Sequence, residues 1–238
     1  MQAADKFITD IEKTVEIFKN RLMKISKGSQ QEILLLVSEL DFYDELIKAG
    51  YLKSLKNFLD EYEETVDSLL AQAKGLGLKG FSQIRLGQLE AMTQLDAEWL
   101  LGSAEAYGAQ LKSSMVKGIT QGSSIIQIKD SMLQTFEKFP LTTNQLTVAV
   151  NQSFTNYRNV SLKNIFPADQ KYILTHPADG KTRVICQYAI AQMANSPKGL
   201  TMAEIDGGAL GGEYSFMNLG GFNCRGEWDI LETKENES

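Results

Sequence analysis

Apolar residues recur at helical spacing through the first two thirds of the chain. The first such stripe predicts a helix with one apolar seam, whose residues are spaced three and four positions apart: Ile8, Ile11, Val15, Phe18, Leu22 and Ile25. Two interpretations remain open. The seam faces the core of a helical bundle in the same chain, or it forms a coiled coil with a second copy or a partner. Both make these residues an expected interface with another helix.

Further helices are predicted between breaks in this pattern. KGSQQ and the glycine-rich AKGLGLKGFSQ interrupt the apolar stripes. Ser124 and Thr142 each stand before a new stripe, with Gln127 and Gln145 three residues further on. This spacing is typical of a capping box, so we expect Ser124 and Thr142 to be the N-caps of two helices.

The pattern changes after about Pro167. KYILTH is expected to be a strand, VICQYAIAQMA a short helix, GGALGGEYSFMNLGGFN a loop and EWDIL a final strand. The predicted fold is mostly α with a small α+β C-terminal module: a helical N-terminal part followed by a glycine-rich compact domain. We expect a helical region over 1–110, a helical connector over 111–165, the α+β module over 166–232 and a disordered tail over 233–238.

Composition narrows the classes of protein. No apolar run in the 238 residues approaches the roughly 18 needed to span a bilayer, so no membrane role is expected. The chain is expected to stay in a cytoplasm or to be packed into a particle assembled there. The net charge of −6 is unfavourable for wrapping a phosphate backbone. Contact with nucleic acid would need a local basic patch, for which the candidates are Lys112, Lys117, Arg158 and Lys163.

The chain has only two cysteines, which is too few for a disulfide scaffold. Each lies beside an arginine in the part where strands and turns are expected. The first belongs to D-x-x-T-R-x-x-C, formed by Asp179, Thr182, Arg183 and Cys186. The second, 38 residues later, belongs to N-C-R, formed by Asn223, Cys224 and Arg225, with Trp228 shortly after it.

Three interpretations of the cysteines are open. Both can be small buried hydrophobic residues. Alternatively, Cys186 and Cys224 are two ligands of a structural metal site, with His176 and Asp179 as the third and fourth. In the third interpretation one cysteine is a nucleophile, and His176, the single histidine, is its base.

The order of these motifs resembles the phage head morphogenesis family, the Mu F-like minor head proteins. Members typically have a helical N-terminal part, a segment echoed here by VKGITQGSSIIQI, and then the two cysteine motifs. The resemblance covers roughly Leu111 to Ile230, although VNQ at 150–152 replaces the R-T-E signature of the family. The matching residues are Tyr172, Asp179, Thr182, Arg183, Cys186, Asn223, Cys224 and Arg225.

The resemblance implies a structural minor head protein of a tailed bacteriophage or prophage, located in the virion. It would act in head assembly or DNA delivery near the portal vertex. Its partners would be portal and capsid proteins, and self-association is possible. No cofactor and no enzymatic activity are expected. Two alternatives stay open: an enzyme such as a nuclease or transferase in the C-terminal module, and a DNA-binding internal head protein. Against an enzyme, GGALGG is not followed by the GK[ST] of a phosphate-binding loop.

The chain departs from the family around N-C-R. Members often carry a histidine shortly before this motif and a cysteine directly after it, where this chain has Gly221 and Gly226. We therefore expect no stoichiometric metal.

The expected role of this segment is a structural closure. Asn223 would satisfy turn backbone groups, and Cys224 would pack against Cys186 as a reduced thiol. Arg225 would make a planar, multi-donor contact, and Trp228 would cover the site.

Overall fold

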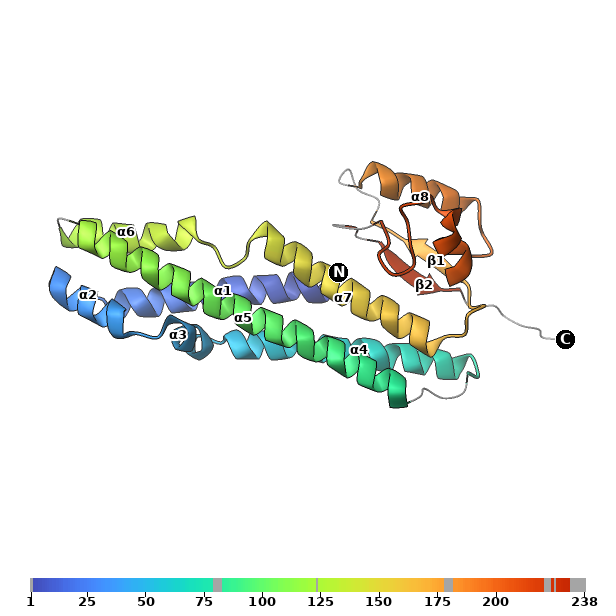
Figure 1. Cartoon of the computed structure of the whole chain (residues 1–238), viewed down its shortest axis with the longest axis horizontal. Helices are drawn as coiled ribbons and strands as arrows, with labels where there is room; N and C mark the ends of the chain where they lie inside the picture. Colours follow the sequence, from blue (N-terminus) through green and yellow to red (C-terminus); the bar gives the residue numbers. More distant parts are fainter. Residues whose placement is uncertain are drawn as a thin grey trace. The chain divides into compact units, whose positions relative to one another are not determined.

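A computed structural model of the chain describes residues 2–78, 83–122, 124–177, 182–220, 224 and 226–231. The fold is mostly α with a small α+β part, as predicted (Figure 1). The helical part comprises α1 (Gln2–Ile25), α2 (Gln30–Glu39), α3 (Phe42–Lys48), α4 (Tyr51–Gly75), α5 (Gln83–Gln121), α6 (Ile125–Lys138) and α7 (Asn144–Ile165). The C-terminal part comprises β1 (Tyr172–Thr175), α8 (Val184–Ala194), α9 (Met202–Glu204), the π-helical turn η1 (Ile205–Ala209) and β2 (Glu227–Ile230). Among the described residues, no helix has the length and apolar character to span a membrane.

The chain forms two compact units, each assembled from separate stretches of sequence. One, the helical unit, comprises Gln2–Asp60 and Gln94–Thr147; the other, the C-terminal unit, comprises Glu61–Thr93 and Val148–Ser238. Helix α5 runs without a break through the boundary expected after residue 110, and the two units divide within this helix between Thr93 and Gln94. A stripe pattern read along the sequence detects breaks between helices, whereas these units are defined by which helices share a core.

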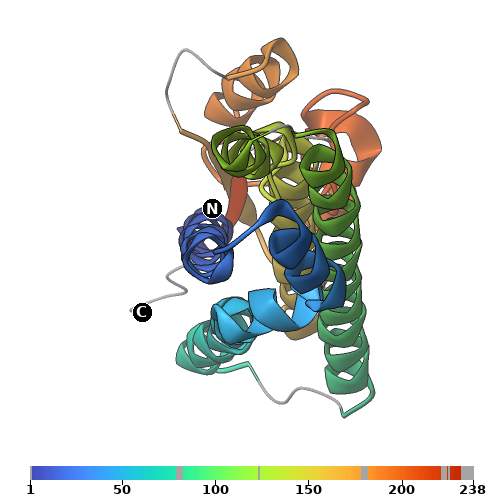
Figure 2. The same ribbon diagram turned by 90° about the vertical axis from the view of Figure 1, so that its left-hand side faces the viewer.

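The core of the helical unit is built on the apolar face of α1. Phe7 stacks on Phe58 of α4 with ring centroids 4.7 Å apart. Phe18 makes edge contacts with Phe42 of α3 and Phe136 of α6, at 5.5 and 5.6 Å. Figure 2 views α1 nearly end-on, with α2 beside it. Offset and edge contacts are the preferred geometries of aromatic pairs, so these rings fix how the helices pack.

The buried stripe of α1 differs in part from the predicted seam. Ile11, Phe18 and Leu22 are fully buried, Ile8 and Val15 are half-buried, and Ile25 is 45% exposed. An α-helix has 3.6 residues per turn, so a stripe with a 3.5-residue period drifts around it. Ile25 therefore lies outside the buried face. The buried part of the seam packs within the helical unit, which removes it as an interface for a second copy.

The helix caps follow the sequence pattern with one shift. Ser124 caps α6 as predicted and accepts a hydrogen bond from the backbone N–H of Gln127. At α7 the predicted cap is wrong by one residue. The N–H of Leu146 donates to Oγ1 of Thr143 at 3.1 Å, whereas the hydroxyl of Thr142 donates to a carboxylate of α1.

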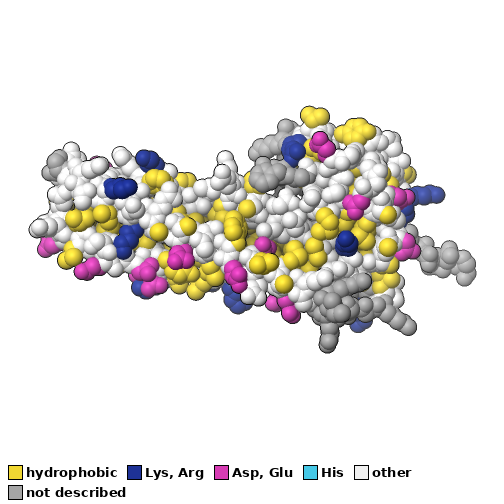
Figure 3. All heavy atoms as spheres, in the orientation of Figure 1, with side chains coloured by type: hydrophobic (Ala, Val, Ile, Leu, Met, Phe, Trp, Pro, Cys, Tyr) yellow, Lys and Arg dark blue, Asp and Glu magenta, His cyan; other side chains and the backbone are white. Residues whose placement is uncertain are grey.

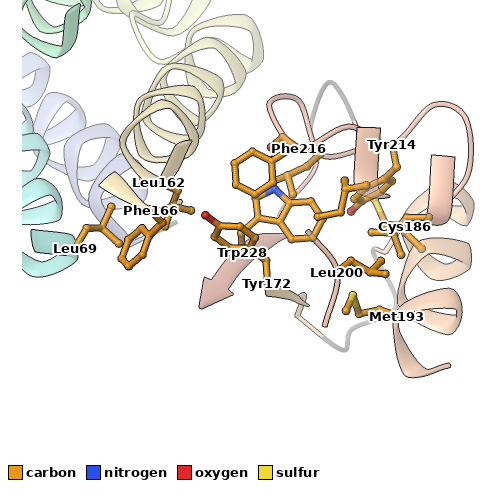
Figure 4. Close-up of a cluster of buried hydrophobic side chains, with 14 of the residues drawn as sticks. Leu69, Leu162, Phe166, Tyr172, Cys186, Met193, Leu200, Tyr214, Phe216 and Trp228 are labelled. Atoms are coloured by element: carbon orange, nitrogen blue, oxygen red, sulfur yellow. The ribbon is translucent and has the colours of Figure 1, made fainter. Parts of the chain in front are cut away.

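The C-terminal unit joins α4 and α7 to the α+β module in one core. On the helical side, Tyr62 of α4 stacks on Tyr157 of α7 with centroids 4.3 Å apart. Leu69 and Phe166 belong to the same buried cluster as Trp228 of β2 (Figure 4). The expected division between a connector at 111–165 and a module at 166–232 therefore does not separate two cores.

Among the described residues, the sheet of this unit has two strands. β1 pairs antiparallel with β2, in a register that places Tyr172 opposite Ile230 and Leu174 opposite Trp228. Tyr172 also forms an isolated bridge with Leu200. Both strands lie in the C-terminal part, as the change of pattern after Pro167 predicted.

Leu22→Asp should lower the free energy of unfolding by about 2–5 kcal/mol, because it removes a buried side chain and leaves a carboxylate without water. Ile17→Asp on the same helix is the matched control. Ile17 is 48% exposed, so the same substitution should change stability by less than about 0.5 kcal/mol. Chemical unfolding followed by circular dichroism measures both variants. Equal stabilities would show that the stripe through Leu22 is not the core face.

Candidate functional site

The candidate site lies where β1, α8 and the segment before β2 meet. Cys186 lies in the first turn of α8 and is buried. Two hydrogen bonds hold the entry to this helix: Thr182 Oγ1 donates to the carbonyl of Pro177 at 3.1 Å, and Gln187 Nε2 donates to the carbonyl of Thr182 at 2.8 Å. The motif residue Thr182 thus ties the start of α8 to the end of β1.

The two cysteines approach each other as predicted. The Sγ atoms of Cys186 and Cys224 are 3.6 Å apart, and both residues are free thiols. The hydroxyl of Tyr214 lies 3.3 Å from Sγ of Cys224. Three segments therefore converge on one pair of sulfur atoms, although the cysteines are 38 residues apart.

Glycines on both sides of Cys224 make this approach possible. A Cβ at Gly220 would lie 2.8 Å from Cε2 of Tyr214 and 3.0 Å from Sγ of Cys186. A Cβ at Gly226 would lie 3.0 Å from Cδ1 of Leu174 and 3.2 Å from Cδ2 of His176. The 2.8 Å contact at Gly220 leaves no room for a methyl group unless a neighbour moves, while a methyl group at Gly226 would be tightly packed.

His176, at the end of β1, faces the same centre. The nitrogen and sulfur donor atoms of His176, Cys186 and Cys224 all lie within 4.8 Å of one another. Nδ1 of His176 lies 3.1 Å from the carbonyl oxygen of Pro177. A carbonyl only accepts, so this bond requires Nδ1 to carry the proton and leaves Nε2 with its lone pair.

Three aromatic residues, Tyr214, Phe216 and Trp228, belong to the buried cluster that contains Cys186 (Figure 4). Trp228 is fully buried, its ring is stacked on Phe216 at 5.5 Å, and its Nε1 donates to the carbonyl of Phe216 at 2.8 Å. Tyr214 meets the Trp228 ring edge-on at 6.3 Å. Trp228, predicted to cover the site, lies in the same buried cluster as Cys186, and Tyr214 contacts the sulfur of Cys224. Sequence reasoning missed Tyr214, and its only signal was an aromatic residue within GGEYSFMNLGG.

The structure places one of the remaining motif residues and does not describe the other three. Arg183 is the N-cap of α8, and its backbone is extended there. Asp179, Asn223 and Arg225 lie outside the described residues. The turn expected at Asn223 and the planar contact expected of Arg225 therefore stay predictions.

Two of the four candidate basic residues make contacts with the protein's own backbone. Arg158 donates to the carbonyl of Trp228 at 2.7 Å and pairs with Asp229 at 3.5 Å. Lys112 donates to the carbonyl of Leu40 at 2.7 Å. On the face drawn in Figure 3, lysine and arginine side chains lie singly among acidic and neutral ones.

The environment of Cys186 favours the protonated thiol. Burial raises its pKa to about 11, and neighbouring Cys224 adds to the shift, while a hydrogen bond from Tyr214 and the charge of Arg183 act in the opposite direction. The thiolate is the nucleophilic form of cysteine, so a raised pKa disfavours the interpretation of Cys186 as a nucleophile. Burial also raises the pKa of Tyr214.

Comparisons with protein-family models, with curated proteins and with solved structures found no match to this chain. What the site does must therefore be inferred from the motifs of the chain and from their geometry.

Gly220→Ala should destabilise the protein by about 1–3 kcal/mol, because the new methyl group would overlap Tyr214 and Sγ of Cys186. Gly212→Ala is the control, since a Cβ there meets no heavy atom within 4 Å. It should change stability by less than about 0.5 kcal/mol. The measurement is thermal unfolding of the reduced chain. A Gly220→Ala variant as stable as Gly212→Ala would contradict the close approach at the sulfur pair.

Alkylation of Cys186 should be slow in the folded chain and should accelerate as the pH rises toward 11. At pH 8 the folded thiol should react on the order of 100-fold more slowly than the same cysteine in urea, because its pKa is about 11 when folded and about 8.5 when unfolded. Iodoacetamide labelling of reduced, chelator-treated protein, followed by peptide mass spectrometry, measures both rates. A folded rate at pH 8 that equals the unfolded rate would refute the raised pKa.

Proposed function

We propose that this chain is a structural minor head protein of a tailed bacteriophage or prophage, acting in head assembly or DNA delivery near the portal vertex. One observation carries the proposal: the T-R-x-x-C and N-C-R motifs belong to one module, with their cysteine sulfurs 3.6 Å apart. Two motifs that matched by chance would have no reason to meet. Their convergence supports the reading that they match the family as a pair.

The chemistry of the module favours a structural role over its alternatives. Arg158, a candidate for a DNA-binding patch, instead joins α7 to β2 through Trp228 and Asp229. Cys186, a candidate nucleophile, is buried and protonated at neutral pH. Both residues support the module as a compact folded element.

The proposed partners are the portal and capsid proteins. The buried stripe of α1 is not the proposed contact, because Ile11, Phe18 and Leu22 are already packed within the helical unit. A partner would therefore use the outer surface of the protein.

Proteomic analysis of particles tests the proposal. Tailed particles produced by the genome that encodes this chain are separated into DNA-free proheads and filled heads on density gradients. The chain should co-purify with the portal protein in both fractions. Heads assembled without the portal gene are the control, and they should keep the major capsid protein and lose this chain.

Deletion of the gene tests whether the chain is needed for particle assembly. We expect fewer infectious particles, restored by the wild-type gene in trans. If the chain is missing from both head fractions and its deletion leaves the yield of infectious particles unchanged, the proposed role is wrong. If heads without portal protein retain the chain, its place near the portal vertex is wrong.

A further inference from the structure

We propose that His176, Cys186 and Cys224 form a binding site for one zinc ion. The inference rests on the positions of these three side chains and does not depend on the proposed role in a phage head. Each ligand comes from a different element: His176 from the end of β1, Cys186 from α8, and Cys224 from the segment before β2.

The sulfur atoms already have the spacing that a shared metal requires. A tetrahedral zinc ion with Zn–S bonds of about 2.3 Å holds two thiolate sulfurs about 3.8 Å apart. The Sγ atoms of Cys186 and Cys224 are 3.6 Å apart. Binding requires both thiols to lose their protons, so each zinc ion would release about two protons to solvent.

The histidine supplies the third ligand from a favourable tautomer. One ring nitrogen of His176 lies within 4.8 Å of both sulfurs, and a tetrahedral site brings nitrogen and sulfur to about 3.6 Å, a shift of roughly 1 Å. Nδ1 of His176 donates to the carbonyl of Pro177, which leaves Nε2 for the ion. A second ring nitrogen that donates to a backbone carbonyl is the usual support of a metal-binding histidine.

The residues around Cys186 and Cys224 are arranged as expected for metal ligands, beyond what a packed pair of thiols needs. Gly220 and Gly226 bring the backbone close on both sides, and Gly226 leaves room for the ring of His176. The hydroxyl of Tyr214, 3.3 Å from Sγ of Cys224, is placed to donate to a thiolate there. Three protein ligands leave the fourth tetrahedral position to water.

The sequence predicted no stoichiometric metal, because glycine stands at 221 and 226. That expectation rested on the positions next to N-C-R, although His176 was already a candidate third ligand in the sequence. The antiparallel sheet brings in His176, which lies directly after Thr175, the residue opposite Glu227 in the register. Two thiolates and one imidazole favour zinc over magnesium or calcium, which prefer oxygen ligands.

Zinc titration of the full-length chain, reduced and stripped with a chelator, tests the site. We expect one zinc ion per chain by elemental analysis and an increase in Tm with zinc. X-ray absorption of the zinc-bound protein should show two sulfur neighbours near 2.3 Å and one histidine nitrogen near 2.0 Å. Cobalt substitution should produce thiolate-to-metal charge-transfer absorption. A zinc shell of oxygen and nitrogen without sulfur would overturn the proposal, and this result requires no variant to fold.

Variants assign the ligands. Cys186→Ser, Cys224→Ser and His176→Gln should each weaken zinc binding by more than about 100-fold, beyond the usual effect of losing an outer-shell partner. Lys198→Ala, an exposed change in the same unit, is the control and should bind zinc as the wild type does. Circular dichroism verifies that each variant is folded. Folded cysteine variants with wild-type affinity would refute the site.

Reversible oxidation tests the zinc site in the wild-type chain, without any substitution. Mild oxidant should join the two cysteines and abolish zinc binding, and reductant should restore it, because the same sulfurs serve both states. Zinc bound before oxidation should protect both thiols. If the reduced chain binds no more zinc than the oxidised chain, the sulfurs are a packed pair and the proposal fails.

Discussion

The stacking of Trp228 on Phe216 is the contact on which the C-terminal module depends. A sheet of two four-residue strands is marginal by itself. Trp228 anchors it in three directions: its ring packs on Phe216, its Nε1 bonds the Phe216 carbonyl, and its own carbonyl accepts from Arg158 of α7. Strand, glycine-rich segment and helix are thereby joined at one buried residue, which gives the cysteine-bearing segments a fixed base.

The sequence predicts local structure here better than it predicts division into units. VICQYAIAQMA corresponds residue for residue to α8, and the cap at Ser124 is where the pattern indicates. These features depend on neighbours within one or two turns. Two features depend on which distant helices share a core: Ile25 is exposed, and α5 passes through the expected boundary. The period of the apolar pattern carries no information about such distant contacts.

At the candidate site, too, some features follow from the sequence and others from tertiary structure. The paired motifs were enough to predict that Cys186 and Cys224 meet, and they do. The part played by Tyr214 depends on the close approach of the backbone at Gly220, which is set by tertiary structure. His176 was one of several candidate ligands in the sequence. The antiparallel pairing of β1 with β2 places it near both sulfurs, whereas Asp179 lies outside the described residues.

Each unit is assembled from two separate stretches of sequence, and this affects how the chain can fold during synthesis on the ribosome. Residues 2–60 emerge first, but the rest of their core lies at 94–147. Residues 61–93 likewise wait for 148–238. The apolar faces of α1 and α4 can therefore be covered only in part while much of the chain is still being translated. Nascent chains in that state expose hydrophobic surface and are prone to aggregate, so this chain would need protection by chaperones during much of its synthesis.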